Sequence, residues 1–514
     1  MAKNNQIVLG GSLLTLKEVV QIARCHYQVG INRDSREKIH HSRRYVESLL
    51  EEKRVVYGLT TGFGKFSDTY IPSEMGKELQ LNLIRSHACG LGEPLPDDVV
   101  RAVILLRVNA LLHGHSGIRL AVLETMVEML NKGVTPVIPE QGSLGASGDL
   151  APLAHLALVL MGEGEAKYRG EQLSGLEALA RAGISPVSLE AKEGLALING
   201  TQVMTAIAAL ACWDAIQLAN WADCTAALTA DVLRGVKQAF EPETHEIRPH
   251  LGQQEVARNM LRLTAGSQLI TNQGELRVQD AYSIRCVPQV HGASRDALQH
   301  IHEKLLIEMN SVTDNPLIFA DKDKVISGGN FHGQPMALIM DYLAIAVAEL
   351  ANISERRVER LVNPQLNGDL PGFLTKRGGM NSGLMIVQYT AASIVSENKS
   401  LAHPASVDSI PSSANQEDHV SMGTIAARKA ASIVNNSYRV IAIELFCGAR
   451  AADYRGSEKL GKGTNRLYTI CRRHVPFIED DHVMYPYLNK IVELMKEMEI
   501  TEEIEQLLQK DLGA

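Results

Sequence analysis

The segment QPMALIMDYLAIAVAELANISERRVERL, residues 334–361, decides the fold of this 514-residue chain. Pro335 suits the first position of a helix, and Asn363-Pro364 marks the end of that helix. Between these signals, apolar residues recur at steps of four and three: Ile339, Leu343, Ala346, Leu350 and Ile353. Such a stripe predicts a long helix that packs against other helices.

Similar alanine- and leucine-rich patterns recur along the chain and predict further long helices. They cover residues 203–239, 292–310, 382–401 and 419–449. Strand signals are few and are limited to residues 54–59, 166–173 and 317–320. The low aromatic content of 4% and the many alanines favour close packing between helices. We therefore predict a mainly α fold, with a loop-rich N-terminal region at residues 1–200 and a helical bundle domain at residues 201–514.

Composition and charge exclude several classes of function. The net charge is −8 and no long Lys/Arg block occurs, so we expect no nucleic-acid partner. The N-terminal sequence MAKNNQIVLGGSLLTLKEVV is too polar for a signal peptide. No continuous apolar run reaches the ~18–20 residues of a membrane helix. We expect a soluble, cytoplasmic protein that does not bind a membrane.

The cysteines and histidines show no metal-binding or disulfide pattern. The seven cysteines are odd in number and never spaced as C-x-x-C, which argues against disulfides and zinc–cysteine sites. We expect Cys89 and Cys286 to be small buried hydrophobic residues. The histidines lack the spacing and acidic neighbours of a metalloprotease motif, so we expect no metal site.

The segment GASGDL, residues 145–150, can build an electrophile from its own backbone. If the amide nitrogen of Gly148 attacks the carbonyl of Ala146, a five-membered ring closes. Loss of two waters then leaves a conjugated imidazolone whose exposed methylene comes from Ser147. Gly148 has no Cβ to block the tight turn, Ala146 is small, and Ser147 supplies the leaving hydroxyl. The tripeptide alone is more often a simple turn, so the surrounding sequence carries the signal.

The longer run EQGSLGASGDLAPLAHLALVLMGEGE, residues 140–165, resembles the cofactor loop of the histidine and phenylalanine ammonia-lyase family. In that family the ring is called MIO, 4-methylidene-imidazole-5-one. The resemblance continues in several blocks, in the same order, from about residue 8 to the mid-400s. It implies a long central helix bundle, as in ammonia-lyases, fumarase and aspartase, topped by a MIO-bearing N-terminal region. It also implies no external cofactor, and a homotetramer whose active sites take residues from several subunits.

Two blocks resemble the family's proton-handling and carboxylate-binding segments. VYGLTTGFGKF, residues 56–66, makes Tyr57 the candidate base for the β-proton of the substrate. Because a tyrosine in water has a pKa of about 10, Tyr57 would need a lowered pKa or a nearby positive charge. In VQDAYSIRC, residues 278–286, the resemblance implies that the guanidinium group of Arg285 binds the substrate carboxylate through two hydrogen bonds. Tyr282 would be a second proton-handling group, and Gln279 would be a hydrogen-bonding partner within the site. Without the resemblance, Tyr57 would be assigned to packing at a strand end and Arg285 to an ordinary salt bridge.

Three further blocks supply binding residues by resemblance. In EGLALINGT, residues 193–201, Asn199 would hold the carbonyl of the electrophile or the substrate amine; otherwise it would cap a helix. In SGGNFHG, residues 327–333, Phe331 would form an aromatic wall. In NSGLM, residues 381–385, Met385 would be an apolar contact, although packing explains a methionine there almost as well.

The last two blocks concern the ring of the substrate. NLIRSHACG, residues 82–90, places His87 where family members bind a polar ring, either an imidazole or the phenol of tyrosine. In SANQEDHVSM, residues 413–422, this chain has Glu417 followed by Asp-His, as do family members that act on histidine. Members that act on phenylalanine or tyrosine usually have Asn-Gln-Asp there. A carboxylate can accept an imidazole N–H but would be desolvated without a partner against a phenyl ring.

The resemblance therefore implies a carbon–nitrogen lyase that converts L-histidine to trans-urocanate and ammonia, the first step of histidine degradation. Gly448-Ala449-Arg450 stands where the family usually carries glutamine, and residues 476–486 are only partly similar to the histidine-acting members. The alternatives are a tyrosine ammonia-lyase or an MIO-dependent aromatic aminomutase. A non-catalytic helical oligomer would be expected to have lost Tyr57, Ser147 or Arg285. The resemblance leaves two alternatives open, in which either the amine or the aromatic ring of the substrate attacks the electrophilic methylene.

Overall fold

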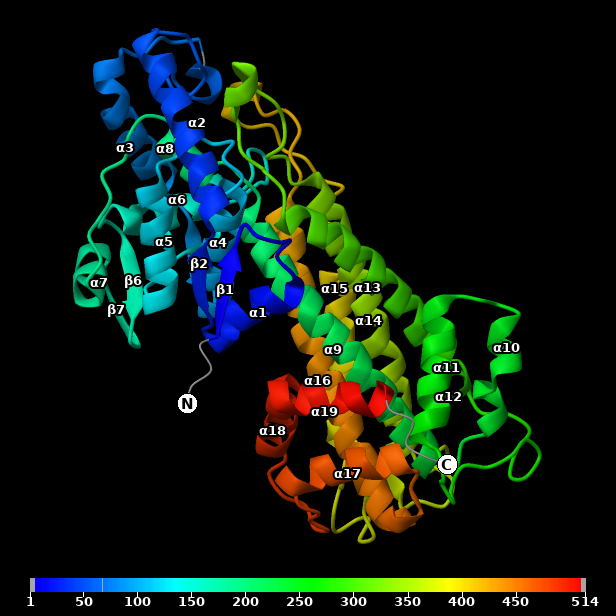
Figure 1. Cartoon of the computed structure of the whole chain (residues 1–514). Helices are drawn as coiled ribbons and strands as arrows, with labels where there is room; N and C mark the ends of the chain where they lie inside the picture. Colours follow the sequence, from blue (N-terminus) through cyan, green and yellow to red (C-terminus); the bar gives the residue numbers. More distant parts are fainter. Residues whose placement is uncertain (1–4, 67, 510–514) are drawn as a thin grey trace. The chain divides into compact units, whose positions relative to one another are not determined.

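The computed structural model describes residues 5–66 and 68–509 (Figure 1). The chain forms two compact units, each made of three stretches of sequence. Unit 1 comprises Met1–Trp213, His302–Asp341 and Pro404–Arg428, and unit 2 comprises Asp214–Ile301, Tyr342–His403 and Lys429–Ala514. The division near residue 200 stays a prediction, because compact units do not show which part of a chain folds on its own.

Five long helices dominate the secondary structure, and the predicted mainly α fold is confirmed. They are α9 (Gln202–Val232), α13 (Val287–Met309), α14 (Gln334–Val362), α15 (Met385–Leu401) and α16 (Gly423–Arg455). Each begins within about five residues of its predicted start. Helix α9 ends earlier than predicted because Arg234 adopts a left-handed conformation (φ 55°), and the chain continues in the short 3-10 helix η3 (Lys237–Phe240).

The apolar stripe on α14 is buried as predicted. Leu343 and Leu350 are fully buried, and Ile339, Ala346 and Ile353 are nearly so. In unit 2 the long helices are also joined by polar contacts across their buried faces. Ser294 on α13 donates a hydrogen bond to the carbonyl of Ala346 on α14 at 2.8 Å. The stripe therefore forms part of the core of a helix bundle, as its spacing requires.

The remaining helices of unit 2 are shorter. They are α10 (Pro242–Glu246), α11 (Leu251–Leu263), α12 (Tyr282–Arg285), α17 (Lys462–His474), α18 (Tyr485–Lys496) and α19 (Met498–Gln509), with the 3-10 helices η3, η5 (Gly372–Leu374) and η7 (Ser457–Lys459). Helix α12 is only one turn long, and it carries two of the predicted site residues, Tyr282 and Arg285.

Unit 1 contains eight further α-helices among its described residues, of which α2, with 19 residues, is the longest. They are α1 (Leu16–Cys25), α2 (Arg33–Glu51), α3 (Gly76–His87), α4 (Asp97–Leu111), α5 (Leu120–Lys132), α6 (Leu150–Leu160), α7 (Gly175–Ala182) and α8 (Glu193–Ile198). The short 3-10 helices are η1 (Gly64–Phe66), η2 (Ser73–Met75), η4 (Ala320–Lys322) and η6 (Ser413–Asn415). Helix α1 begins with a capping box between Thr15 and Glu18.

The strands form small sheets in unit 1. Strands β1 (Gln6–Leu9) and β2 (Gln28–Ile31) are parallel. The antiparallel sheets are β3 (Leu91–Pro94) with β5 (Pro139–Gln141), β4 (Thr135–Pro136) with β6 (Glu165–Tyr168) and β7 (Glu171–Ser174), and β8 (Leu317–Phe319) with β9 (Lys324–Ile326). The predicted strand at 317–320 is confirmed as β8. The predicted strand at 166–173 is a hairpin, in which Glu165 pairs with Ser174.

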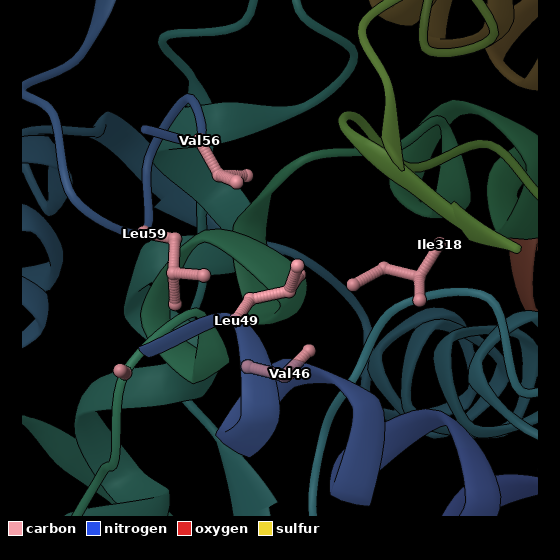
Figure 2. Close-up of a cluster of buried hydrophobic side chains, with 6 residues drawn as sticks. Val46, Leu49, Val56, Leu59 and Ile318 are labelled. Atoms are coloured by element: carbon pink, nitrogen blue, oxygen red, sulfur yellow. The ribbon is translucent and has the colours of Figure 1, made fainter. Parts of the chain in front are cut away.

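The predicted strand at residues 54–59 is wrong, because this segment is a turn. Gly58 has φ +66°, and the carbonyl of Val56 accepts the N–H groups of Leu59 (3.1 Å) and Thr60 (3.0 Å). Figure 2 shows Val56 and Leu59 in a buried apolar cluster with Val46 and Leu49 of α2 and Ile318 of β8. The cluster therefore fixes both sides of the turn that presents Tyr57.

Two helices in the described part of the chain are long and apolar enough to cross a membrane, namely α9 and α14. Within the protein, 83% of the apolar window of α9 and 67% of that of α14 are buried. Core helices of globular proteins have the same composition, so this is weak support for a membrane span.

Candidate active site

Unit 1 contains two adjoining cavities of about 530 and 410 Å³. Both are lined by Tyr57, Gly64, Ser147, Asn199 and Glu417. Phe331 lines the larger cavity and His87 the smaller one. With Ala146, which also lines the larger cavity, seven of the predicted site residues meet around these cavities, and they come from segments far apart in the sequence.

The Ala146-Ser147-Gly148 loop has a backbone that only glycine fits at its third position. Gly148 has φ +72°, and a Cβ there would lie 2.1 Å from the carbonyl oxygen of Gly200. The amide of Asp149 donates to the same carbonyl at 2.7 Å. Ala146 is buried, and both Ala146 and Ser147 line the larger cavity. These residues thus fit a tight backbone ring with its Ser147-derived end directed to the cavity.

Asp149 anchors this loop, and the sequence analysis gave it no role. Its Oδ2 accepts the N–H groups of Val203 (2.9 Å) and Met204 (2.8 Å) in the first turn of α9. Its Oδ1 accepts the hydroxyls of Ser143 (2.8 Å) and Thr424. Burial raises the pKa of Asp149, although these four hydrogen bonds oppose that effect. The carboxyl group therefore ties the loop to two other segments of unit 1.

The segment that carries Glu417 forms the facing wall. The hydroxyl of Ser147 donates to Glu417 Oε1 at 3.2 Å, and the hydroxyl of Ser412 donates to Oε2 at 3.1 Å. A second link lies nearby, where Ser421 Oγ donates to the carbonyl of Gly145 at 3.0 Å. Glu417 is thus held beside the residue that would supply the electrophilic methylene.

Tyr57 lies in the cavity wall, and its phenol oxygen accepts the N–H of Gly64 at 3.1 Å. Its ring meets Phe63 edge-on, with centroids 6.3 Å apart. Burial, reinforced by the charge of Glu417, raises the pKa of Tyr57, while the Gly64 hydrogen bond acts in the opposite direction. Unit 1 by itself therefore keeps the phenol protonated at neutral pH. The lowered pKa that a base requires is not produced by the residues of this unit.

His87 ends helix α3 and has one ring nitrogen committed to the backbone. Its Nδ1 lies 2.9 Å from the carbonyl oxygen of Leu83. Because a carbonyl oxygen only accepts, this contact places the proton on Nδ1. Burial lowers the pKa of His87, so the ring is neutral at pH 7 and Nε2 is an acceptor.

Asn199 is 3% exposed, and its two amide atoms have different environments. Nδ2 donates to the carbonyl of Asn315 at 3.1 Å, whereas Oδ1 has no hydrogen-bond partner among the described residues. Since an unpaired buried carbonyl is costly, this oxygen suits a ligand donor in the cavity. Asn199 is also the C-cap residue of α8, so it caps a helix as the alternative expected, at the C-terminal end.

The other four predicted site residues belong to unit 2 and do not line these cavities. Gln279 and Tyr282 are exposed, with Tyr282 at 70%. The guanidinium of Arg285 lies over the Tyr282 ring, 4.5 Å from its centroid, and its buried Nε has no partner among the described residues. Met385 is half-buried at the first residue of α15.

The cysteine prediction is wrong for Cys89, which is exposed, and Cys286 is only half-buried. Both follow a charged residue by a few positions in loops or helix ends, where a small side chain need not point inward. Among residues 5–66 and 68–509, no group of three or more His, Cys, Asp or Glu side chains could hold a metal ion.

Several lining residues were missed by sequence reasoning. They are Asn315, His332, Gln416, Asp418 and His419. His332, Asp418 and His419 lie within motifs that were identified, so proximity in sequence could have suggested them. Asn315 uses its backbone carbonyl to hold Asn199, and no residue type signals such a role in advance.

Comparisons with known proteins agree on one family. The family profile described as aromatic amino acid lyase matches residues 14–473. A histidine ammonia-lyase of Alkaliphilus metalliredigens is 58% identical over 503 residues, which cover 98% of this chain and 99% of that protein.

Two solved structures have the same fold. Histidine ammonia-lyase from Trypanosoma cruzi has a TM-score of 0.91 and 42% identity, covering 98% of this chain and 95% of that one. The phenylalanine aminomutase of Pantoea agglomerans has a TM-score of 0.92 and 36% identity, covering 96% of this chain and 99% of that one. The fold is thus shared by members with different reactions, whereas sequence identity is higher to the histidine-acting proteins.

Proposed function

Because the chain belongs to the aromatic amino acid lyase family, we propose that it is a histidine ammonia-lyase. It would convert L-histidine to trans-urocanate and ammonia, the first step of histidine degradation. The observation that carries the proposal is that His87 and Glu417 line the same cavity as Ser147. The relatives named above that act on histidine support the same substrate.

The two polar side chains distinguish between candidate rings. With its proton on Nδ1, His87 offers an acceptor at Nε2, and Glu417 offers a carboxylate. An imidazolium ring donates two N–H groups and satisfies both acceptors, whereas a phenol donates one and a phenyl ring none. An acceptor left without a donor in a closed site is penalised, so this arrangement favours histidine over tyrosine and phenylalanine.

We assign the electrophile to MIO formed from Ala146, Ser147 and Gly148. The backbone at Gly148 fits this ring because any side chain there would meet Gly200. When formed, MIO would supply an electrophilic methylene that makes the departure of ammonia easier. The other residues bind, orient and move protons.

Tyr57 is the candidate base for the β-proton, and Asn199 holds the amine end of the substrate. Transfer of that proton to the Tyr57 oxygen leaves its electron pair to form the new double bond as the carbon–nitrogen bond breaks. Asn199 Oδ1, which lacks a partner among the described residues, can accept an N–H of the substrate ammonium. Phe331 walls the larger cavity.

The carboxylate clamp is assigned to unit 2 of another copy of the chain in a homotetramer. Arg285 would bind the substrate carboxylate, with Gln279 and Tyr282 beside it and Met385 as an apolar contact. Nearby positive charge from Arg285 would also lower the pKa of Tyr57 as catalysis requires.

Exposed apolar side chains support such an assembly. Leu338, Tyr342 and Ile345 follow one face of α14 at helical spacing, and Ile386 and Tyr389 are exposed on α15. Clustered apolar surface of this kind is typical of subunit interfaces. We assign the protein to the cytoplasm, without a nucleic-acid or membrane partner.

Glu417→Gln is expected to lower kcat/KM for L-histidine by roughly 10- to 150-fold. A hydrogen bond to a charged group contributes about 1.5–3 kcal/mol, and the amide keeps the size of the side chain while removing its charge. The measurement is steady-state formation of trans-urocanate. Glu171→Gln, which removes a surface partner of Arg181, is the control and should leave kcat/KM unchanged. If Glu417→Gln leaves histidine turnover unchanged while the wild type prefers tyrosine, the tyrosine-acting alternative replaces this proposal.

A further inference from the structure

A buried charge network lies within unit 2, and it shares no residue with the linings of the two cavities of unit 1. It contains two carboxylates, Asp223 and Glu444, two guanidinium groups, Arg295 and Arg357, and one imidazole, His291. The side chains of Arg357 and Glu444 are fully buried, as is that of Asp223. With a neutral imidazole, the charges of these two carboxylates and two guanidinium groups balance, and Arg295 also contacts the exposed carboxylate of Glu255 at 2.9 Å.

Arg357 and Glu444 form the centre of the network. Arg357 Nε donates to Glu444 Oε1 at 2.6 Å and its terminal nitrogen to Oε2 at 2.8 Å. The carboxylate is completed by the hydroxyls of Thr229 (2.7 Å) and Ser354 (2.6 Å). A bidentate pair of this kind fixes the plane of the guanidinium group.

His291 joins this pair to Asp223. Its Nδ1 lies 2.8 Å from Asp223 Oδ1, and its Nε2 lies 3.5 Å from Arg357 Nη1. Because a guanidinium group only donates, Nε2 accepts and the ring proton is on Nδ1. Asp223 is held in turn by Arg295 at 2.6 Å.

The same Nη1 atom of Arg357 reaches the one-turn helix α12. It donates to the carbonyl oxygen of Ser283 at 3.4 Å, and Ser283 lies between Tyr282 and Arg285. A second anchor precedes the turn, where Asp280 Oδ2 accepts the N–H of Val236 at 2.6 Å. The guanidinium group of Arg285 lies over the Tyr282 ring, and its Nε has no hydrogen-bond partner among the described residues. The backbone contacts therefore set where its guanidinium group lies.

We propose that Arg357 is a positioning residue, which together with Glu444 and His291 fixes helix α12 and thereby places Arg285 for the substrate carboxylate. The inference rests on the proposed function, since it uses Arg285 as the clamp. Stability alone does not explain such a network, because buried ion pairs are often replaced by apolar residues at no cost. A displacement of about 1 Å in a positioned group can cost roughly 100-fold in rate.

Arg357→Lys tests the proposal because lysine keeps the charge but lacks the planar fork. A single ammonium group cannot hold both oxygens of Glu444 and also reach Ser283 and His291. We expect KM for L-histidine to rise by roughly 10- to 100-fold. The inhibition constant of histamine, which has the ring and amine but no carboxylate, should change by less than about twofold, because Arg285 does not contact it.

Arg295→Lys is the matched control, since it alters the other arginine of the network, whose hydrogen bonds and ion pairs among the described residues go to Asp223, Asn220 and Glu255 and not to α12. It should leave both constants near the wild-type values. His291→Asn provides a milder second variant, because the asparagine amide can still donate to Asp223, whereas its shorter side chain has no acceptor at the position of His291 Nε2, which faces Arg357. It should raise KM for L-histidine more than the inhibition constant of histamine, as Arg357→Lys does, but by a smaller factor.

Hydrogen exchange supplies a readout that needs no substrate. Amides of residues 281–286 should exchange faster in Arg357→Lys than in the wild type or in Arg295→Lys. The positioning role of Arg357 is overturned if exchange at residues 281–286 is unchanged in Arg357→Lys. It is also overturned if KM for L-histidine and the inhibition constant of histamine rise by the same factor. If the wild type acts instead on another aromatic amino acid, the proposed function fails, and the same comparison is made with that amino acid and its amine.

Discussion

Ser147→Ala is expected to remove nearly all ammonia release while the protein stays folded. Without the hydroxyl there is no water to eliminate, so no methylene can form at this position. Enzymes accelerate reactions by at least about 10⁶-fold, and acid–base groups account for about 10²–10⁴ of that, so we expect a loss of roughly 10²-fold or more. The side chain lines a cavity and makes a single 3.2 Å hydrogen bond, which contributes about 1 kcal/mol. Turnover is measured by ammonia release and folding by thermal unfolding.

Ser327→Ala is the matched control for this change. Ser327 also lines the larger cavity, and its hydroxyl donates to Asn315 Oδ1 at 3.3 Å, but it is not part of the Ala146–Gly148 loop. Its loss should cost far less activity. Intact mass adds a direct reading, because the wild type should be lighter than its sequence by two waters and Ser147→Ala should not. Substantial activity in Ser147→Ala would contradict the role given to this residue.

Tyr57→Phe is the second large expected effect, a fall in kcat of roughly 10²–10⁴-fold. Phenylalanine keeps the ring and its contact with Phe63 but removes the oxygen that would take the β-proton. The fold should persist, because only the hydrogen bond from Gly64 is lost. Steady-state kcat and thermal unfolding together check the prediction.

The pH dependence of kcat in the wild type should reflect ionisation of the Tyr57 phenol. Within unit 1 burial raises the pKa of Tyr57, and Arg285 of another copy would oppose that effect; with either balance, the basic form that takes a proton is formed as the pH rises. The rate should therefore increase with pH through this ionisation, and Tyr57→Phe should lose that increase. Tyr70→Phe is the control, because Tyr70 is exposed and does not line either cavity. A near-normal rate in Tyr57→Phe would move the base to Tyr282.

The helical part of the fold could be predicted because burial leaves a regular trace in the sequence. Leu343 and Leu350 recur on one face of α14, and both are fully buried. The turn at residues 54–59 could not be predicted in this way. Its apolar residues Val56 and Leu59 pack into a cluster with α2 and β8, so they look like a strand although Gly58 turns the chain between them.

The candidate site was predictable where the chemistry is carried by side chains. His87, Ser147 and Glu417 come from separate motifs and line one cavity. The supporting contacts were not predictable, because they involve backbone atoms. Asp149 binds the amides of Val203 and Met204, and the carbonyl of Asn315 holds Asn199. The direction of the Tyr57 pKa shift likewise depends on burial, which the motif does not reveal.

The most direct measurement is product analysis of the purified wild type with histidine, tyrosine and phenylalanine supplied separately. The account predicts trans-urocanate and ammonia from L-histidine, and little or no product from the other two amino acids. Release of the arylacrylate from tyrosine, or formation of a β-amino acid, with no trans-urocanate from histidine, would contradict it.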